Sequence, residues 1–183
     1  MARVFLSVGS NLGDRLECLR RAVDQLRAMQ DLRFLDASPL YRTEPWERAS
    51  AREQADDGGW FFNCAVELET SLDPGVLLER LQDVERALGR LRKPGTPEEG
   101  RFERRELDID ILLYGNRVIS GPDHLHIPHL LMHERRFVLH PLADLAPEIE
   151  HPVLYQTIRE LLEALEDEHQ VLMADLPRRW FER

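Results

Sequence analysis

A run in which aspartates alternate with aliphatic residues, Leu107 to Ile111, places the strongest constraint on what this chain can fold into. Asp108 and Asp110 stand between apolar neighbours, which is the period of a half-buried β-strand. The two carboxylates then face the same side, roughly 6.5 Å apart along the strand. Such neighbours repel unless a cation compensates them, and Mg²⁺ takes oxygen ligands together with substrate phosphates. The run therefore predicts a metal site that handles phosphate.

Basic residues gather just before this strand. Residues 90 to 105 hold six basic side chains against three acidic ones, although the whole chain has a net charge of -10. An acidic protein with one basic segment is expected to bind a small anionic ligand rather than nucleic acid. Pro94, Gly95, Pro97 and Gly100 exclude regular structure there. The segment is typical either of a lid that closes over a charged substrate or of a disordered surface loop.

Length and composition predict an ordinary soluble domain. The 183 residues are 43% hydrophobic and 32% charged, and we expect a single domain over residues 1 to 183. No apolar run is long enough for a signal peptide or a membrane span, so cytoplasm is the expected compartment, with no membrane partner. Cys18 and Cys64 lie within regular apolar patterns and are expected to be reduced core thiols.

Hydrophobic periodicity predicts a mixed order of helices and strands. Strands are expected over Val4–Val8, Leu32–Tyr41 (broken by Pro39), Phe62–Leu68 and from Leu107, with a hairpin from Gly115-Asn116 into Val118-Ile119. Helices are expected over Arg15–Met29, with Asp14 as a cap, and from Pro74 to Gly89, with Asp73 as the cap. Further helices are expected from Arg135 to Leu142 and over Thr157–Glu168, the last giving a C-terminal helical extension from about residue 161. This order predicts an α+β fold close to a ferredoxin-like plan, with a mixed or antiparallel sheet and helices on its faces in three layers, α/β/α.

Two polar features have more than one interpretation. His124, His126 and His129 fall within six residues, but no cysteine or carboxylate stands at zinc-ligand spacing, which favours one histidine donating to a phosphate. Asn63 lies on a predicted strand, where a plain surface residue and a functional one are equally expected.

Several blocks of the chain, taken together, resemble the 6-hydroxymethyl-7,8-dihydropterin pyrophosphokinases of folate biosynthesis. The Arg-x-Leu-Asp-x-Asp block is the most specific of them. The resemblance implies a magnesium-dependent transfer of pyrophosphate from ATP to the hydroxymethyl group of the pterin, giving AMP and the pterin diphosphate. In order, the blocks are Gly9-Ser10-Asn11-Leu12-Gly13, Tyr41-Arg42-Thr43, Phe62-Asn63-Cys64-Ala65-Val66, Leu88-Gly89-Arg90, the stretch from Arg105 to Leu113, Ile127-Pro128-His129, and Arg135 with Phe137.

The resemblance also implies roles for individual residues. Two Mg²⁺ ions would be held by Asp108 and Asp110, which with Arg90 and Arg105 form the implied catalytic set. The implied ATP contacts are Gln82, Glu85, Arg90, Arg92, Arg101, Arg105, Ile111, His129 and Arg135. The implied pterin contacts are Thr43, Pro45, Trp46, Phe61, Asn63, Phe102 and Phe137, with Phe102 and Phe137 enclosing the flat ring.

The leading hypothesis is thus an ATP-dependent diphosphotransferase that acts as a monomer on two small molecules. One alternative is a degenerate relative that binds pterin or nucleotide without turnover. A second is a ferredoxin-like regulatory module whose acidic strand faces solvent. Arg104 stands where the family usually has proline, and Phe61 and Leu130 stand where it often has tyrosine. Each lost hydroxyl removes a hydrogen bond worth about 1 kcal/mol.

Overall fold

The computed structural model describes residues 1–46, 59–88, 107–121 and 125–182. Within these ranges no helix has the length and apolar character needed to cross a membrane. The elements in chain order are β1 (Ala2–Ser10), α1 (Arg15–Ala28), β2 (Leu32–Ala37), β3 (Tyr41–Thr43), β4 (Phe61–Thr70), α2 (Pro74–Ala87), β5 (Asp108–Tyr114), β6 (Ile119–Ser120), β7 (His126–Ile127), the 3-10 turn η1 (Met132–Glu134), α3 (Arg136–Leu145), α4 (Ile158–Ala164) and β8 (Val171–Met173).

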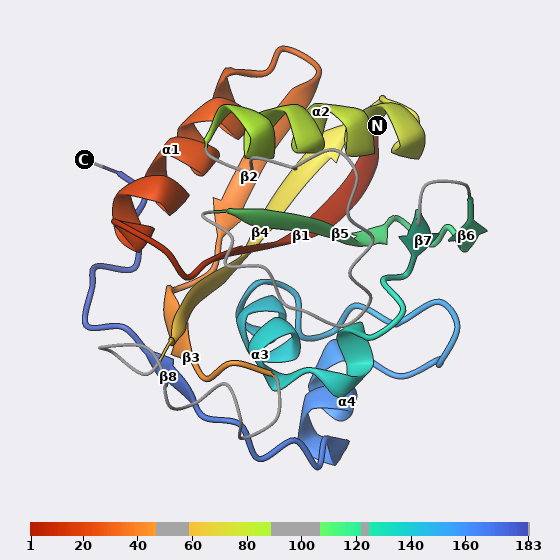
Figure 1. Cartoon of the computed structure of the whole chain (residues 1–183). Coiled ribbons are helices and arrows are strands. Elements are labelled where there is room, and N and C mark those ends of the chain that lie inside the picture. Colours follow the sequence, from red (N-terminus) through yellow and green to blue (C-terminus); the bar gives the residue numbers. More distant parts are fainter. Residues whose placement is uncertain (47–58, 89–106, 122–124, 183) are drawn as a thin grey trace, which may run out of the picture.

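One antiparallel sheet organises the molecule (Figure 1). Its order is β5-β1-β4-β3-β8, and β2 also pairs with β4. Because β1 and β2 both pair antiparallel with β4, they run parallel to each other with β4 inserted between them, which is a split β-α-β unit. The predicted α+β class is confirmed.

Helices cover both faces of this sheet. Figure 1 shows α1 and α2 over one face, and α3 with α4 on the other. The first face packs Leu19, Val23 and Leu26 of α1 into the larger apolar core, while Leu139 and Leu142 of α3 belong to a second core on the opposite face. Each helix therefore buries one apolar stripe against the sheet. Both cysteines are free thiols, as predicted.

The helix starts follow the predicted capping chemistry. Asp14 accepts a hydrogen bond from the backbone N–H of Glu17 at 3.0 Å, and α1 begins at the next residue after this cap. Asp73 caps α2 in the same way, with Pro74 at the first helical position. The break predicted at Pro39 is also confirmed, since it separates β2 from β3.

Strand β5 has the predicted alternation. Ile109 and Ile111 are buried, whereas Asp108 and Asp110 are partly exposed. Beyond them the register with β1 shifts, because Leu6 lies opposite Ile111 and Phe5 lies opposite Leu113. The extra residue, Leu112, forms a β-bulge, so that Leu112 and Leu113 both belong to the second core while Tyr114 belongs to the first.

The predicted hairpin after Gly115 is wrong. Gly115 does turn the chain with a φ of 50°, but β6 pairs with β7 and not with β5. The outer edge of β5 is used by other groups: the Glu85 side chain accepts from the backbone N–H of Ile109, and the backbone of His129 donates to the carbonyl of Leu112. A returning strand would displace both hydrogen bonds.

The predicted C-terminal helix is too long. Helix α4 ends at Ala164, with Leu165 as its C-cap, and the chain then extends into β8 (Val171–Met173), which pairs with β3. The helical extension predicted from about residue 161 is therefore wrong beyond Leu165. Residues Glu166 to Glu168 are all acidic, so another helical turn would have no apolar side chain to bury.

Candidate active site

Apart from Ile111, the predicted site residues carried by strands face one side of the sheet. Gly9 on β1 lies opposite Asn63 on β4 and opposite Asp108 on β5. Thr43 on β3 lies opposite Phe61 on β4. Side chains of opposed residues in antiparallel strands point to the same face, and residues two apart on a strand share a face. The face is the one covered by α3.

A histidine and an arginine stand near the two aspartates. Burial lowers the pKa of the Arg135 guanidinium. The charges of Asp110 and Asp108 act in the opposite direction and have a smaller effect. Burial, reinforced by the charge of Arg135, lowers the pKa of His129 to about 4, against an opposing effect of Asp108. His129 is therefore neutral at pH 7.

The hydrogen bonds of His129 define which nitrogen carries its proton. Its Nδ1 accepts from the backbone N–H of Leu131 at 3.3 Å. In a neutral imidazole the other nitrogen, Nε2, is then the donor. Among the described polar groups, Nε of Arg135 is buried without a hydrogen-bond partner. His129 and Arg135 therefore supply N–H groups suited to an anionic ligand.

Asn63 is a buried residue, and the plain surface interpretation is wrong. Asn63 is only 5% exposed, and its Nδ2 donates a hydrogen bond to Oγ1 of Thr43 at 2.6 Å. Gly9 makes room for it, because a Cβ built on Gly9 would lie less than 3.0 Å from Oδ1 of Asn63. The amide is therefore fixed from two sides, which suits recognition of a flat ring that displays both donors and acceptors.

The two predicted ATP residues on α2 differ in environment. Glu85 is 2% exposed and its Oε1 accepts from the backbone N–H of Ile109 at 2.9 Å. Ile109 lies between the two aspartates, so Glu85 fixes the strand that carries them. Gln82, one turn earlier, is partly exposed. Ile111 has its side chain in the core, which leaves only its backbone for a ligand contact.

Aromatic side chains lie beside the start of α3. The rings of Trp46 and Phe137 are 6.2 Å apart, edge to face, and the guanidinium of Arg135 lies 5.8 Å from the centre of each. Pro45, two residues beyond the end of β3, and Phe61, the first residue of β4, are partly buried. An aromatic pair with a cation over both rings is suited to stacking against a flat heterocycle.

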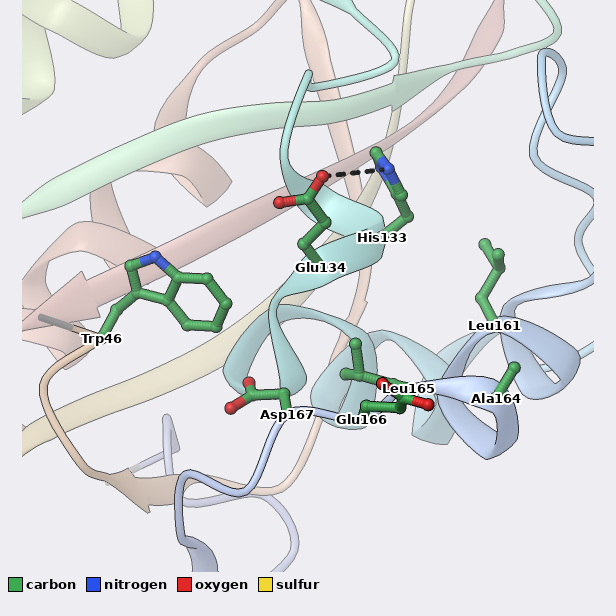
Figure 2. Close-up of a pocket in the computed structure, with 8 residues that line it drawn as sticks. All are labelled: Trp46, His133, Glu134, Leu161, Ala164, Leu165, Glu166 and Asp167. Carbon is green, nitrogen blue, oxygen red and sulfur yellow. Dashed lines mark ion pairs between the residues drawn. The ribbon is translucent and has the colours of Figure 1, made fainter.

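Trp46 also borders a pocket of about 420 Å³ (Figure 2). It is bounded by η1 and by the end of α4, and it contains none of the strand residues described above. We therefore do not assign it to ATP or pterin. Its lining residues are Trp46, His133, Glu134, Leu161, Ala164, Leu165, Glu166 and Asp167.

Part of the predicted site lies outside the residues that the structure describes. Five residues between α2 and β5 were predicted to contact substrate and belong to this part, and Arg104 does too. These are Arg90, Arg92, Arg101, Phe102 and Arg105.

The aspartate pair fits magnesium better than zinc. The described part of the chain has no group of three or more His, Cys, Asp or Glu side chains arranged for a metal ion. Asp108 and Asp110 supply two hard oxygen donors on one strand face, and Mg²⁺ commonly binds to one or two carboxylates plus substrate phosphates. The donor set therefore fits an ion that arrives with a phosphate ligand.

The fold and this face together define an α+β protein with a charged site suited to phosphate, next to an aromatic slot. The model of the family 7,8-dihydro-6-hydroxymethylpterin-pyrophosphokinase (HPPK) matches residues 5–147. The chain belongs to this family, and the family predicted from the sequence is confirmed.

Individual relatives agree with the family model. A protein of Methylorubrum extorquens named 2-amino-4-hydroxy-6-hydroxymethyldihydropteridine pyrophosphokinase is 39% identical over 166 residues, which cover 91% of this chain and 95% of that protein. A Bacillus subtilis protein of the same name is 40% identical and covers 80% of this chain and 79% of its own.

A solved structure shows the same fold. The Plasmodium falciparum HPPK-DHPS structure (A437G, with SDX-DHP) superposes with a TM-score of 0.66 at 18% identity and covers 88% of this chain. This chain spans 45% of that one, so the likeness concerns the fold of one part of it.

Proposed function

We infer that this chain transfers pyrophosphate from ATP to 6-hydroxymethyl-7,8-dihydropterin, giving AMP and the pterin diphosphate in folate biosynthesis. Membership of the pyrophosphokinase family supports this reaction and the enzyme class. The observation that carries the assignment is the position of Gly9, opposite Asp108 on one side and Asn63 on the other. Neighbouring strands are about 4.8 Å apart, so the backbones of Asp108 and Asn63 are separated by roughly 10 Å.

That spacing fits the two substrates of the reaction. The triphosphate would lie over β5, where Asp108 and Asp110 are, and the pterin would lie over β4, where Asn63 is. The hydroxymethyl group then points from β4 toward β5, across the strand that carries Gly9. The hydroxyl oxygen attacks the β-phosphorus and the bond from β-phosphorus to the bridging oxygen of the α-phosphate breaks. AMP leaves with that oxygen, and the hydroxyl proton is released.

On the ATP side we propose that Asp108 and Asp110 hold two Mg²⁺ ions. When bound, these ions neutralise the triphosphate charge and favour in-line attack. The guanidinium of Arg135 and the Nε2–H of His129 donate to phosphate oxygens. His129 can donate in its neutral form, because its Nε2 carries the hydrogen. The remaining proposed ATP contacts are Gln82, Glu85, Arg90, Arg92, Arg101, Arg105 and the backbone of Ile111.

On the pterin side we propose that Asn63 recognises the ring edge. Its Nδ2 keeps one hydrogen on Thr43 and has a second for the ligand, and Oδ1 accepts. Phe137 and Trp46 supply aromatic surface for the ring, with Phe102 proposed on its other face. Pro45 and Phe61 complete the proposed slot. Phe61 has no hydroxyl, so contacts there are apolar.

The finer description of the fold belongs to the same proposal. The split β-α-β unit supports a ferredoxin-like assignment, and the helices on both faces support three layers, α/β/α. We also propose that residues 1 to 183 form one domain that acts as a monomer on ATP and the reduced pterin.

The reaction is tested by incubating the purified protein with ATP, Mg²⁺ and 6-hydroxymethyl-7,8-dihydropterin and measuring AMP. We expect AMP to form only when all three are present, with one AMP for each pterin consumed. Calorimetric binding of both ligands with no AMP above background would instead support a degenerate relative that binds without turnover.

A further inference from the structure

The chain beyond α4 returns to the residues of the proposed pterin slot. The family model matches residues 5–147, so the segment from Leu165 to Met173 lies outside the matched part. It nevertheless reaches both the start of α3 and the stretch that ends in Trp46. Three sets of contacts connect it to them.

The first set is centred on Asp167, whose side chain is 3% exposed. Its carboxylate accepts from the backbone N–H of Arg136 at 2.8 Å. The Arg136 side chain binds back, with Nε donating to the carbonyl of Asp167 at 2.7 Å and a terminal nitrogen donating to the carbonyl of Leu165 at 3.1 Å. Arg136 lies between Arg135 and Phe137, so Asp167 fixes the backbone that carries both.

The second set runs from Asp167 to Trp46 through His169. The same carboxylate accepts from the backbone N–H of His169 at 2.9 Å and lies 2.5 Å from its Nδ1. Burial raises the pKa of Asp167, but the hydrogen bonds from His169 and Arg136 outweigh it and lower the pKa. The His169 ring then lies 5.2 Å from the ring of Trp46 at an angle of 32°.

The third set is a short piece of sheet. Strand β8 pairs with β3, which places Val171 opposite Thr43. One residue further along, the backbone of Glu44 donates to the carbonyl of Gln170 at 3.0 Å, and the Glu44 side chain accepts from the backbone N–H of Gln170 at 3.0 Å. The stretch from Thr43 to Trp46 is thus held along its length.

We propose that Leu165–Met173, with Asp167 at its centre, is a positioning element that sets the separation of Trp46 and Phe137 in the pterin slot. One carboxylate connects to both side chains: to Phe137 through its hydrogen bond with the backbone of Arg136, and to Trp46 through His169, whose ring packs against it. The inference rests on the proposed function, because it assumes that the ring binds against these two side chains. Asp167 and His169 are positioning residues, since they act on the ligand through their neighbours.

The test compares Asp167→Asn and His169→Ala with the wild type in steady-state AMP formation. Asn keeps the size of Asp but presents an N–H group to a site built from N–H donors, and Ala removes the ring that packs on Trp46. Glu168→Gln is the matched control, because Glu168 is an exposed acidic neighbour. Thermal unfolding of each variant gives the folded fraction.

We expect the KM for the pterin to rise tenfold or more in Asp167→Asn and about threefold to tenfold in His169→Ala, because small displacements of substrate-positioning groups have large effects. The KM for ATP should change less than threefold, and Glu168→Gln should match the wild type. A loss of folded protein alone would lower kcat without moving the pterin KM.

The inference is overturned if both variants keep the wild-type pterin KM, whether or not kcat falls. Because His169 is partly exposed, its variant gives a reading even if Asp167→Asn fails to fold. Turnover by the wild type decides the proposed function separately. An inactive wild type with intact pterin binding would refute that function, and the dissociation constants of the same variants for the pterin would then decide the positioning role.

Discussion

Gly9→Ala gives the sharpest test of the active-site face. A Cβ at this position would lie less than 3.0 Å from Oδ1 of Asn63, a separation that real structures do not tolerate. Asn63 has little freedom to move, because it is buried and donates to Thr43 at 2.6 Å. We therefore expect the amide to rotate away and the hydrogen bond with Thr43 to break.

The size of the effect follows from that bond. A buried polar group left without its partner costs about 1–3 kcal/mol. If Asn63 recognises the pterin, the same displacement weakens binding by a comparable amount, which is about 5- to 150-fold in the pterin KM. Replacing glycine with alanine also restricts the unfolded chain and offsets about 0.4–1 kcal/mol. The free energy of unfolding should therefore fall by about 0–2.6 kcal/mol.

The assay is a double-mutant cycle on the pterin KM, measured by AMP formation, with Gly9→Ala, Asn63→Ala and the double variant. Because both changes act on one side chain, Gly9→Ala should have less than a twofold effect in the Asn63→Ala background. Gly75→Ala is the matched control, since a Cβ there meets only an ordinary contact of 3.6 Å. Additive effects, or an unchanged pterin KM in Gly9→Ala, would refute the reasoning.

Three further predictions concern the metal pair, the hydrogen bond of Tyr41 and pH. Asp110→Ala should lower kcat by about 10²–10³-fold with an unchanged circular dichroism spectrum, since a half-exposed strand position tolerates alanine; retained turnover would rule out the metal role. Tyr41→Phe removes an O–H that donates to Asp144 at 2.5 Å and should lower the free energy of unfolding by about 1 kcal/mol in urea; no change in the midpoint would contradict this. Burial, with a smaller effect of a neighbouring histidine, lowers the pKa of His151, whose Nδ1 accepts from two backbone N–H groups. The unfolded state then binds the proton first, so stability should fall as pH decreases from about 6.5, and His151→Asn should flatten this dependence; equal slopes would exclude the assignment.

Local patterns in the sequence predicted the elements that carry the site. The alternation around Asp108 depends only on the period of a strand, and the caps at Asp14 and Asp73 depend only on side chains within three residues. Both kinds of signal act over short distances, and both are confirmed by the structure. The class of reaction needed the family blocks, because an aspartate pair on a strand also occurs in other metal sites.

Long-range contacts decided what the sequence could not predict. The hairpin after Gly115 failed because the outer edge of β5 bonds to Glu85, 24 residues away from its partner Ile109. The role of Asp167 depends on a contact with Arg136, 31 residues away, and no local pattern marks it. Gly9 stood in a family block, but its part in holding Asn63 depends on strand register, which only the folded sheet defines.

The central claim is that the group transferred over Asp108 and Asp110 is pyrophosphate and that it goes to the pterin. ATP labelled with ³²P at the β-phosphorus tests this most directly, because simple phosphoryl transfer leaves that label on the nucleotide. Separation of the products should show the label in the pterin diphosphate and an equal amount of unlabelled AMP. Label recovered in ADP, with an unlabelled pterin product, would contradict the account.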